Sequence, residues 1–81
     1  MTKNEILEKV QDVLRECFDD DELDVTMETT AADVDGWDSL RHITILAALE
    51  DEFRIRFSMN DARKAKNVGD LVDVIERLVK W

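Results

Sequence analysis

Apolar side chains recur at the spacing of an amphipathic α-helix in three segments, and no other feature limits the fold of this 81-residue sequence as strongly. One apolar stripe runs through residues 6–18, another runs through residues 68–79, and a third segment spans residues 38–53. The sequence has no proline, so no strong helix breaker interrupts these segments. A chain of this length has room for one small core only. We therefore expect an all-α fold in which residues 1–81 form a single domain.

Capping residues predict where each helix begins and ends. Thr2 and Glu5 have the three-residue separation of a capping box. Asp38 is the expected N-cap of the middle helix, and Asn67 is the expected N-cap of the last one. The acidic residues 19–21 oppose the dipole at the end of the first helix, so we expect that helix to stop there.

Residues 53–57, between the middle and last helices, alternate apolar and basic side chains. Such alternation is typical of a β-strand, but no other segment offers a strand to pair with it. We therefore expect an extended connector whose Ile55 and Phe57 fill the core. Ser58 can then cap one short helical turn over residues 61–65. The predicted fold has three main helices, one short helix and a long first loop.

The middle helix carries apolar side chains on two opposite sides. The side expected to face the core comprises Ile45, Leu46, Leu49 and Phe53. The opposite stripe comprises Leu40, Ile43 and Ala47. A helix on the surface of a monomer needs only one apolar side, so the second stripe predicts a contact surface for partners. The alternative is that the long first loop folds back and covers it.

The formal net charge of −9 is concentrated in residues 17–38, which hold nine acids and no base. Because phosphate repels such a surface, nucleic acid is excluded as a partner. Two interpretations remain open. The stretch is either a solvated loop that keeps the protein soluble, or the source of a field that attracts basic partners to the residues after it.

The remaining composition concerns location and oligomeric state. No apolar run approaches the ~20 residues that span a bilayer, and the N-terminal residues lack the pattern of a signal peptide. A single cysteine cannot form an intramolecular disulfide. We therefore expect a cytoplasmic protein with no membrane span, and we expect a monomer.

Few side chains could support catalysis. Cys17 lies on the apolar stripe of the first helix, where a structural thiol is expected. His42 lies among the core residues of the middle helix, which favours a hydrogen-bonded histidine over a catalytic base. Calcium-loop spacing fails from both Asp20 and Asp33, because glycine and glutamate do not occur at the required positions. We therefore expect no catalytic residue, no metal site and no enzyme activity.

The segment from Asp35 to Leu40 presents a serine at the start of a helix. Gly36 supplies a turn, and Ser39 follows the capping residue Asp38. A phosphate on Ser39 would lie in the favourable field of the helix N-terminus. No histidine with an orienting acid is placed to activate this hydroxyl. A serine that can be modified but cannot act alone predicts an attachment point.

These residues resemble the acyl carrier protein family, whose signature is Asp-Ser-Leu at the head of the second helix, here Asp38, Ser39 and Leu40. The resemblance extends over nearly the whole chain and includes residues 48–53 and 67–72. It implies a four-helix acyl-carrier-like bundle with 4′-phosphopantetheine bound covalently to Ser39. It also implies that this arm carries acyl groups as thioesters. A phosphopantetheinyl transferase that uses coenzyme A and magnesium would install the arm.

The resemblance also implies a surface for the transferase and for acyl-loading and acyl-processing enzymes. Its expected residues are Leu40, Ile43, Thr44, Ala47, Glu50 and Asp51. A small acidic helical adaptor that binds partners through the second helix without modification is the alternative function. A divalent-ion buffer that uses the acidic loop is a third.

Several positions depart from the pattern of carriers in fatty acid synthesis. Arg41 and Thr44 stand where acidic residues are usual. Basic residues lie in the short helix and directly after it, namely Arg63, Lys64 and Lys66. We therefore expect a specialised fatty-acyl or polyketide-like pathway. Ala62 and Ala65 are small and would loosen packing, whereas Phe53 and Phe57 would fill it. We expect a filled core and a short or polar acyl group that stays largely exposed.

Overall fold

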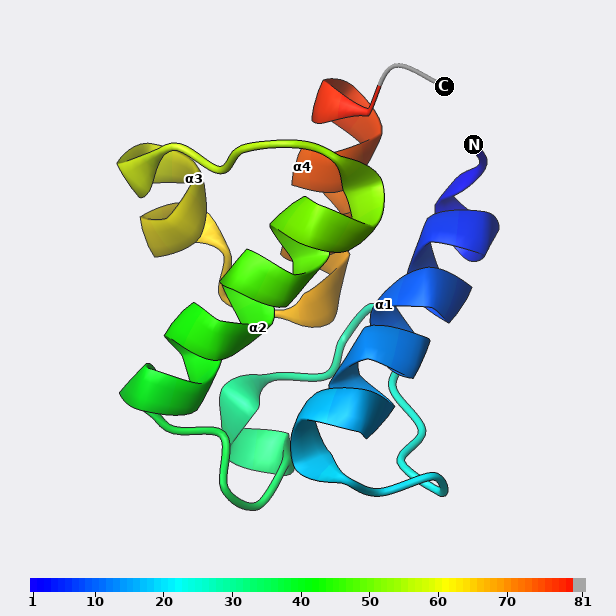
Figure 1. Cartoon of the computed structure of the whole chain (residues 1–81), viewed down its shortest axis with the longest axis vertical. Helices are drawn as coiled ribbons and strands as arrows, with labels where there is room; N and C mark the ends of the chain where they lie inside the picture. The colour runs from blue at the N-terminus through cyan, green and yellow to red at the C-terminus, as the bar shows by residue number, and fades with distance from the viewer. Residues whose placement is uncertain (80–81) are drawn as a thin grey trace.

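The computed structural model describes residues 1–79, and its regular elements are helical (Figure 1). They are α1 (Lys3–Phe18), the short 3-10 helix η1 (Ala31–Asp33), α2 (Ser39–Phe53), α3 (Met59–Lys64) and α4 (Val68–Leu78). No β-strand occurs in residues 1–79. The prediction of three main helices, one short helix and a long first loop is confirmed. No helix in this part of the chain combines the length and apolar character that crossing a bilayer requires.

The core lies where α1 packs against both α2 and α4 (Figure 1). Phe53 is its largest fully buried side chain, and no polar or charged residue is buried among residues 1–79. The stripe expected to face the core from α2 is confirmed at Ile45, Leu49 and Phe53, whereas Leu46 is half-buried. Ile55 is buried and Phe57 packs against the core, as predicted for the connector.

Side-chain caps fix the beginnings of the helices. The Thr2 hydroxyl accepts a hydrogen bond from the Glu5 N–H at 3.2 Å, and the Glu5 carboxylate accepts one from the Thr2 N–H at 2.9 Å. The Asn67 side chain accepts the Asp70 N–H at 2.8 Å at the start of α4. The predicted caps Thr2 and Asn67 are therefore confirmed. Each cap satisfies a backbone donor that the first helical turn leaves without a partner.

The first helix ends at Phe18, as expected, but the backbone shows a second cause besides the dipole. Asp19 lies in the left-handed region with φ 50°. This turn lets the Asp20 N–H donate to the Arg15 carbonyl at 3.0 Å, which satisfies a carbonyl that the helix end would otherwise leave free.

The short helix occupies a slightly different range from the one predicted. Ser58 is its N-cap, since its hydroxyl accepts the Asp61 N–H at 3.0 Å. The first helical residue is therefore Met59 and not Asp61, because an N-cap is followed directly by the helix. The helix ends at Lys64, and Ala65 is the residue that caps it.

The long first loop is held along α1 and the start of α4. Val25 is buried, and its N–H donates to the Gln11 side chain at 2.9 Å. The Gly69 N–H donates to the Met27 carbonyl at 2.7 Å, and a Cβ at Gly69 would lie only 2.7 Å from the same oxygen. Glycine is therefore required at this position by the close approach of the loop.

The path of the loop leaves the second apolar stripe of α2 uncovered. Leu40 is 75% exposed and Ile43 is 64% exposed, and Ala47 is exposed as well. The alternative in which the acidic loop covers this stripe is therefore wrong. The loop cannot reach it because its hydrogen bonds hold it on the α1 and α4 side of the bundle.

Candidate functional site

Ser39 is the first residue of α2, and its side chain is exposed. The Asp38 carboxylate accepts the Arg41 N–H at 2.7 Å, so the predicted N-cap is confirmed. Among residues 1–79 no group forms a hydrogen bond with the Ser39 hydroxyl. The site thus combines a free hydroxyl with the positive end of a helix of 15 residues.

A tight turn delivers Ser39 to this position. Gly36 has φ 86°, a left-handed conformation that residues with a side chain rarely adopt. The Trp37 N–H donates to the Val34 carbonyl at 3.3 Å, and the Asp38 N–H donates to the Gly36 carbonyl at 3.0 Å. The turn therefore fixes Asp38 and Ser39 relative to the axis of α2.

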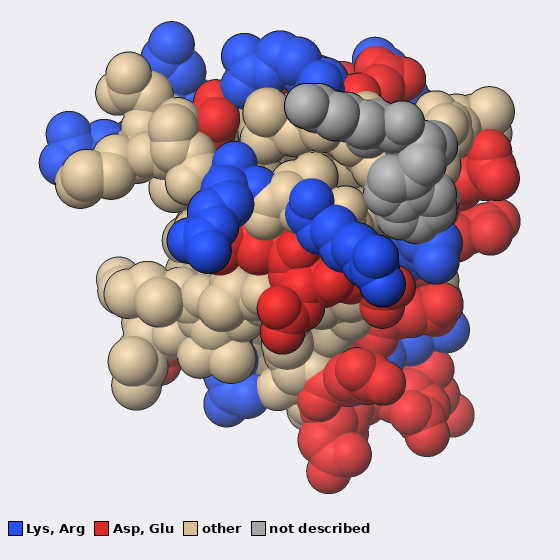
Figure 2. All heavy atoms as spheres, turned by 45° about the horizontal axis from the view of Figure 1, so that its top comes forward, with Lys and Arg blue, Asp and Glu red and all other residues tan. Residues whose placement is uncertain are grey.

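A groove of about 790 Å³ opens beside Ser39, between the first turns of α2 and the short helix α3. Figure 2 shows a hollow at the left of the view, between a lower lobe that is mostly uncharged and an upper lobe that carries basic side chains. The first turns of α2 and the residues before them contribute Trp37, Asp38, Ser39, His42, Ile43 and Leu46. The opposite side contributes Met59, Ala62, Arg63 and Ala65, and η1 contributes Ala31. Most of this lining is apolar, and Arg63 is its one basic member.

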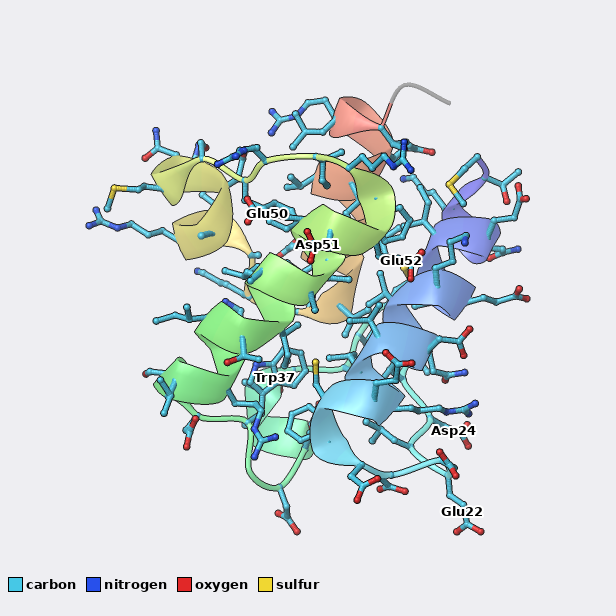
Figure 3. All side chains as sticks on the ribbon, in the orientation of Figure 1. Glu22, Asp24, Trp37, Glu50, Asp51 and Glu52 are labelled. Carbon is cyan, nitrogen blue, oxygen red and sulfur yellow. The ribbon has the colours of Figure 1, made fainter. Side chains whose placement is uncertain are left out.

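Trp37 and His42 form a pair within this lining. The Trp37 Nε1–H donates to His42 Nδ1 at 3.1 Å, and both side chains are partly buried. The Trp37 ring also lies 5.9 Å from the Phe18 ring, centroid to centroid (Figure 3). The prediction of a hydrogen-bonded boundary histidine is confirmed.

Arg41 connects the beginning of α2 to the end of α1. Its guanidinium carbon lies 5.3 Å from the centre of the Phe18 ring, which is a cation–π distance. Its Nη1 also donates to the Cys17 carbonyl at 2.5 Å. Arg41, which stands where carriers in fatty acid synthesis usually have an acidic residue, therefore contacts Phe18 and Cys17 within this chain.

The surroundings of Cys17 are those of a structural thiol. Cys17 is half-buried, and burial raises the pKa of its thiol, although the Arg41 guanidinium opposes the shift. A raised pKa leaves less of the reactive thiolate, which fits the structural thiol predicted for Cys17. Within residues 1–79, no group of three or more histidine, cysteine or acidic side chains is arranged to hold a metal ion.

The predicted partner residues divide into two sets. Leu40, Ile43, Thr44 and Ala47 lie together on the exposed side of α2. Asp51 is exposed near the end of the same helix, and Figure 3 shows it on the face toward the viewer. Glu50 differs, because it is half-buried and its carboxylate accepts the Phe57 N–H at 2.8 Å. Glu50 therefore holds the connector in place.

Several side chains that border the groove carry no signal of this position in the sequence pattern. Met59 is 75% exposed on α3, and Arg63 follows it one turn later. The sequence pattern gives no sign that Trp37 borders a groove, and it places His42 among the core residues of the middle helix as a hydrogen-bonded histidine. The separation of five residues between Trp37 and His42 was the available signal, because the turn before α2 brings these two rings together.

Charge is distributed unevenly over the surface. Figure 2 shows acidic side chains gathered at the lower right and basic side chains across the upper part of the view, over α3 and the connector. In α3, Asp61 pairs with Arg77 at 2.6 Å. The Arg77 hydrogen bond, with a second one from Ser58, lowers the pKa of Asp61. No ion pair forms at Arg63 or Lys64 within the described part of the chain.

A helical bundle with a free serine at a helix N-terminus beside an apolar groove fits a protein that carries a phosphate-linked arm. The comparisons with known proteins agree. The profile of the family described as "Phosphopantetheine attachment site" matches residues 4–75.

Curated relatives and a solved structure extend the match. The chain is 35% identical over 79 residues to the acyl carrier protein of Exiguobacterium sibiricum, covering 98% of this chain and 100% of that one. It is 40% identical over 76 residues to the acyl carrier protein of another Exiguobacterium, covering 94% and 96%. The solution structure of the holo acyl carrier protein from Geobacter metallireducens has a TM-score of 0.84 at 40% identity, covering 89% and 83%.

This protein therefore belongs to the acyl carrier protein family. The resemblance seen in the sequence and the acyl-carrier-like bundle are both confirmed. Phosphopantetheine is the prosthetic group of the family, and its members carry acyl groups rather than transform them. The comparisons do not favour the adaptor interpretation.

Proposed function

We propose that Ser39 is the attachment point of 4′-phosphopantetheine and that this protein carries acyl groups on that arm. The observation that supports this most directly is the exposed, unpaired Ser39 hydroxyl at the N-terminus of α2. The other serine of the sequence, Ser58, uses its hydroxyl to cap α3 and is less free to react.

The residues around Ser39 fit an attached phosphodiester. Backbone N–H groups of the first turn of α2 and the helix dipole stabilise a negative charge there. Asp38 holds the backbone of this turn through the Arg41 N–H, while Leu40 extends into solvent beside it. When bound, the group supplies a terminal thiol that holds acyl groups as thioesters.

Attachment requires a separate transferase. The Ser39 oxygen forms a bond to the phosphorus of the pantetheine arm and loses its proton. The pyrophosphate bond of coenzyme A breaks, and adenosine 3′,5′-bisphosphate leaves. His42 Nδ1 is occupied by the hydrogen bond from Trp37, and no described side chain forms a hydrogen bond with the Ser39 hydroxyl. The base and the magnesium ion are therefore assigned to the transferase.

Intact-mass measurement tests the proposal. The protein is incubated with a phosphopantetheinyl transferase, coenzyme A and magnesium. We expect one phosphopantetheine on the wild type and on Ser58→Ala, and none on Ser39→Ala. Modification of Ser39→Ala, or a wild type that several transferases leave unmodified, would contradict the assignment.

We also propose that partner enzymes dock on the exposed side of α2, over Leu40, Ile43, Thr44 and Ala47. An apolar centre with a charged rim is typical of transient interfaces. Asp38 and Asp51 belong to that rim. Glu50 belongs there only in part, because its carboxylate is bound to the connector.

The pathway remains a proposal as well. We infer a specialised fatty-acyl or polyketide-like pathway from the basic side chains on α3, where Arg63 borders the groove and Lys64 has no ion-pair partner in residues 1–79. A partner of this face would present acidic groups. We also propose that residues 1–81 form a single carrier domain and that the protein is a monomer. We propose a cytoplasmic location because a single cysteine cannot form a disulfide within the chain.

A further inference from the structure

The groove beside Ser39 has a second, much smaller compartment behind it. The inner compartment measures about 30 Å³, against about 790 Å³ for the groove. Both are lined by Ala31, Trp37, His42 and Ala65, so these four residues form the border that the two spaces share. The inner compartment reaches Leu71 of α4, which is 2% exposed and belongs to the core.

The two rings make up most of this border. Ala31 and Ala65 contribute a single methyl group each, whereas Trp37 and His42 contribute ring systems. The hydrogen bond of 3.1 Å between Trp37 and His42 fixes the rings relative to each other. The Phe18 ring supports Trp37 from the α1 side, with the ring centroids 5.9 Å apart.

The size of the inner compartment limits what can enter it while the hydrogen bond between Trp37 and His42 is in place. A volume of 30 Å³ accommodates about one water molecule. An alkyl chain that extends past the groove therefore meets the two rings before it reaches Leu71. Close packing resists expansion, because even one additional methylene is felt in a core.

We propose that the Trp37–His42 pair limits the length of acyl chain that this carrier shelters. The proposal rests on the attachment of the arm at Ser39, whose side chain borders the same groove. The groove holds the part of the acyl group nearest Ser39, and the pair keeps the end of a longer chain out of the core. Trp37 and His42 are in this sense specificity-determining residues for the cargo.

Melting temperatures of loaded proteins test this limit. A phosphopantetheinyl transferase moves the acyl-4′-phosphopantetheine group of each acyl-coenzyme A, from acetyl to dodecanoyl, to Ser39 with loss of adenosine 3′,5′-bisphosphate, and intact mass confirms each product. Each methylene that becomes fully buried raises the melting temperature by roughly 3–6 °C in a domain of this size. For the wild type we expect the melting temperature to stop rising at a short chain.

Variants of the pair shift this plateau. In Trp37→Ala the melting temperature continues to rise over several more carbon atoms, because the core side of the groove is open. His42→Ala is the second variant, for use if Trp37→Ala does not fold. It keeps the contact between Trp37 and Phe18, and its melting temperature should also rise over several more carbon atoms than that of the wild type. Met59→Ala is the matched control, because Met59 borders the groove but not the inner compartment, and its plateau stays where the wild type has it.

Two results would overturn the proposal. One is a wild type whose melting temperature rises through dodecanoyl without a plateau. The other is a plateau that neither Trp37→Ala nor His42→Ala moves. Failure at Ser39 itself is recognised separately, because the intact mass then shows no acyl-phosphopantetheine on the wild type.

Discussion

The indole N–H of Trp37 donates a hydrogen bond to Nδ1 of His42 across 3.1 Å, which joins the turn before α2 to the first turn of that helix. An imidazole nitrogen that accepts a hydrogen bond carries no proton, so the Trp37 contact places the proton of neutral His42 on Nε2. The contact therefore fixes the orientation of both rings at the edge of the groove.

Trp37→Phe removes the donor but keeps an aromatic ring beside Phe18. We expect the free energy of unfolding to fall by about 1 kcal/mol, the net contribution of a typical hydrogen bond. Urea denaturation measures the loss. Combined with His42→Ala in a double-mutant cycle, the two losses should be less than additive, because both variants remove the same bond. Strict additivity would show that the bond contributes nothing.

Gly69→Ala is expected to destabilise the protein, although alanine is the better helix former by about 1 kcal/mol. The new Cβ would lie 2.7 Å from the Met27 carbonyl oxygen, so the first loop must move. We expect a net loss of about 1–3 kcal/mol, the usual cost of overpacking. Thermal unfolding measures it, and a variant more stable than the wild type would refute the argument.

Much of the fold could be predicted because its signals are local. The caps Thr2, Asn67 and Ser58 act on backbone groups within three residues of themselves. The apolar stripes were equally clear, since the helical period alone identifies them. The second apolar stripe of α2 also followed from the sequence, whereas its exposure did not, because it depends on the path of the first loop in three dimensions.

The remaining features depend on contacts between residues far apart in the sequence. Gly69 is needed because of Met27, and Arg41 lies against Phe18. Neither relationship leaves a periodic pattern, because both depend on how the loop and helices meet in three dimensions. The Trp37–His42 pair is close in sequence, but its hydrogen bond requires the turn at Gly36, whose conformation the sequence only suggested.

The pairing of Asp61 with Arg77 predicts a dependence of stability on pH. The hydrogen bond from Arg77, with a further one from Ser58, lowers the pKa of Asp61 below its ordinary value of 3.8. A lowered pKa in the folded state means that the stabilisation is present above pH 3.8 and is lost as the pH falls through the folded value. Asp61→Asn should therefore be less stable than the wild type at neutral pH, with a difference that shrinks below pH 3.8. If the denaturation midpoints of the wild type and Asp61→Asn differed by the same amount at neutral pH and below pH 3.8, the pairing of Asp61 with Arg77 would not be the source of the pH dependence.

Ile43→Asp tests the docking surface on α2. Ile43 is 64% exposed and lies between Leu40 and Ala47, so an aspartate there places a charge at the apolar centre of the surface without disturbing the core. We expect the transferase to modify Ser39 at least about tenfold more slowly, which corresponds to ~1.4 kcal/mol. The melting temperature should stay within a few degrees of the wild type, since an exposed substitution away from the core typically changes stability by only about 0.5 kcal/mol.

Asn4→Asp is the matched control, because it adds the same charge at an exposed position of α1 and should leave the rate unchanged. Raised salt should slow the wild type as well, because charges on the rim act mainly on the rate of association. Equal rates for Ile43→Asp and the wild type would show that this side of α2 is not the docking surface for the transferase.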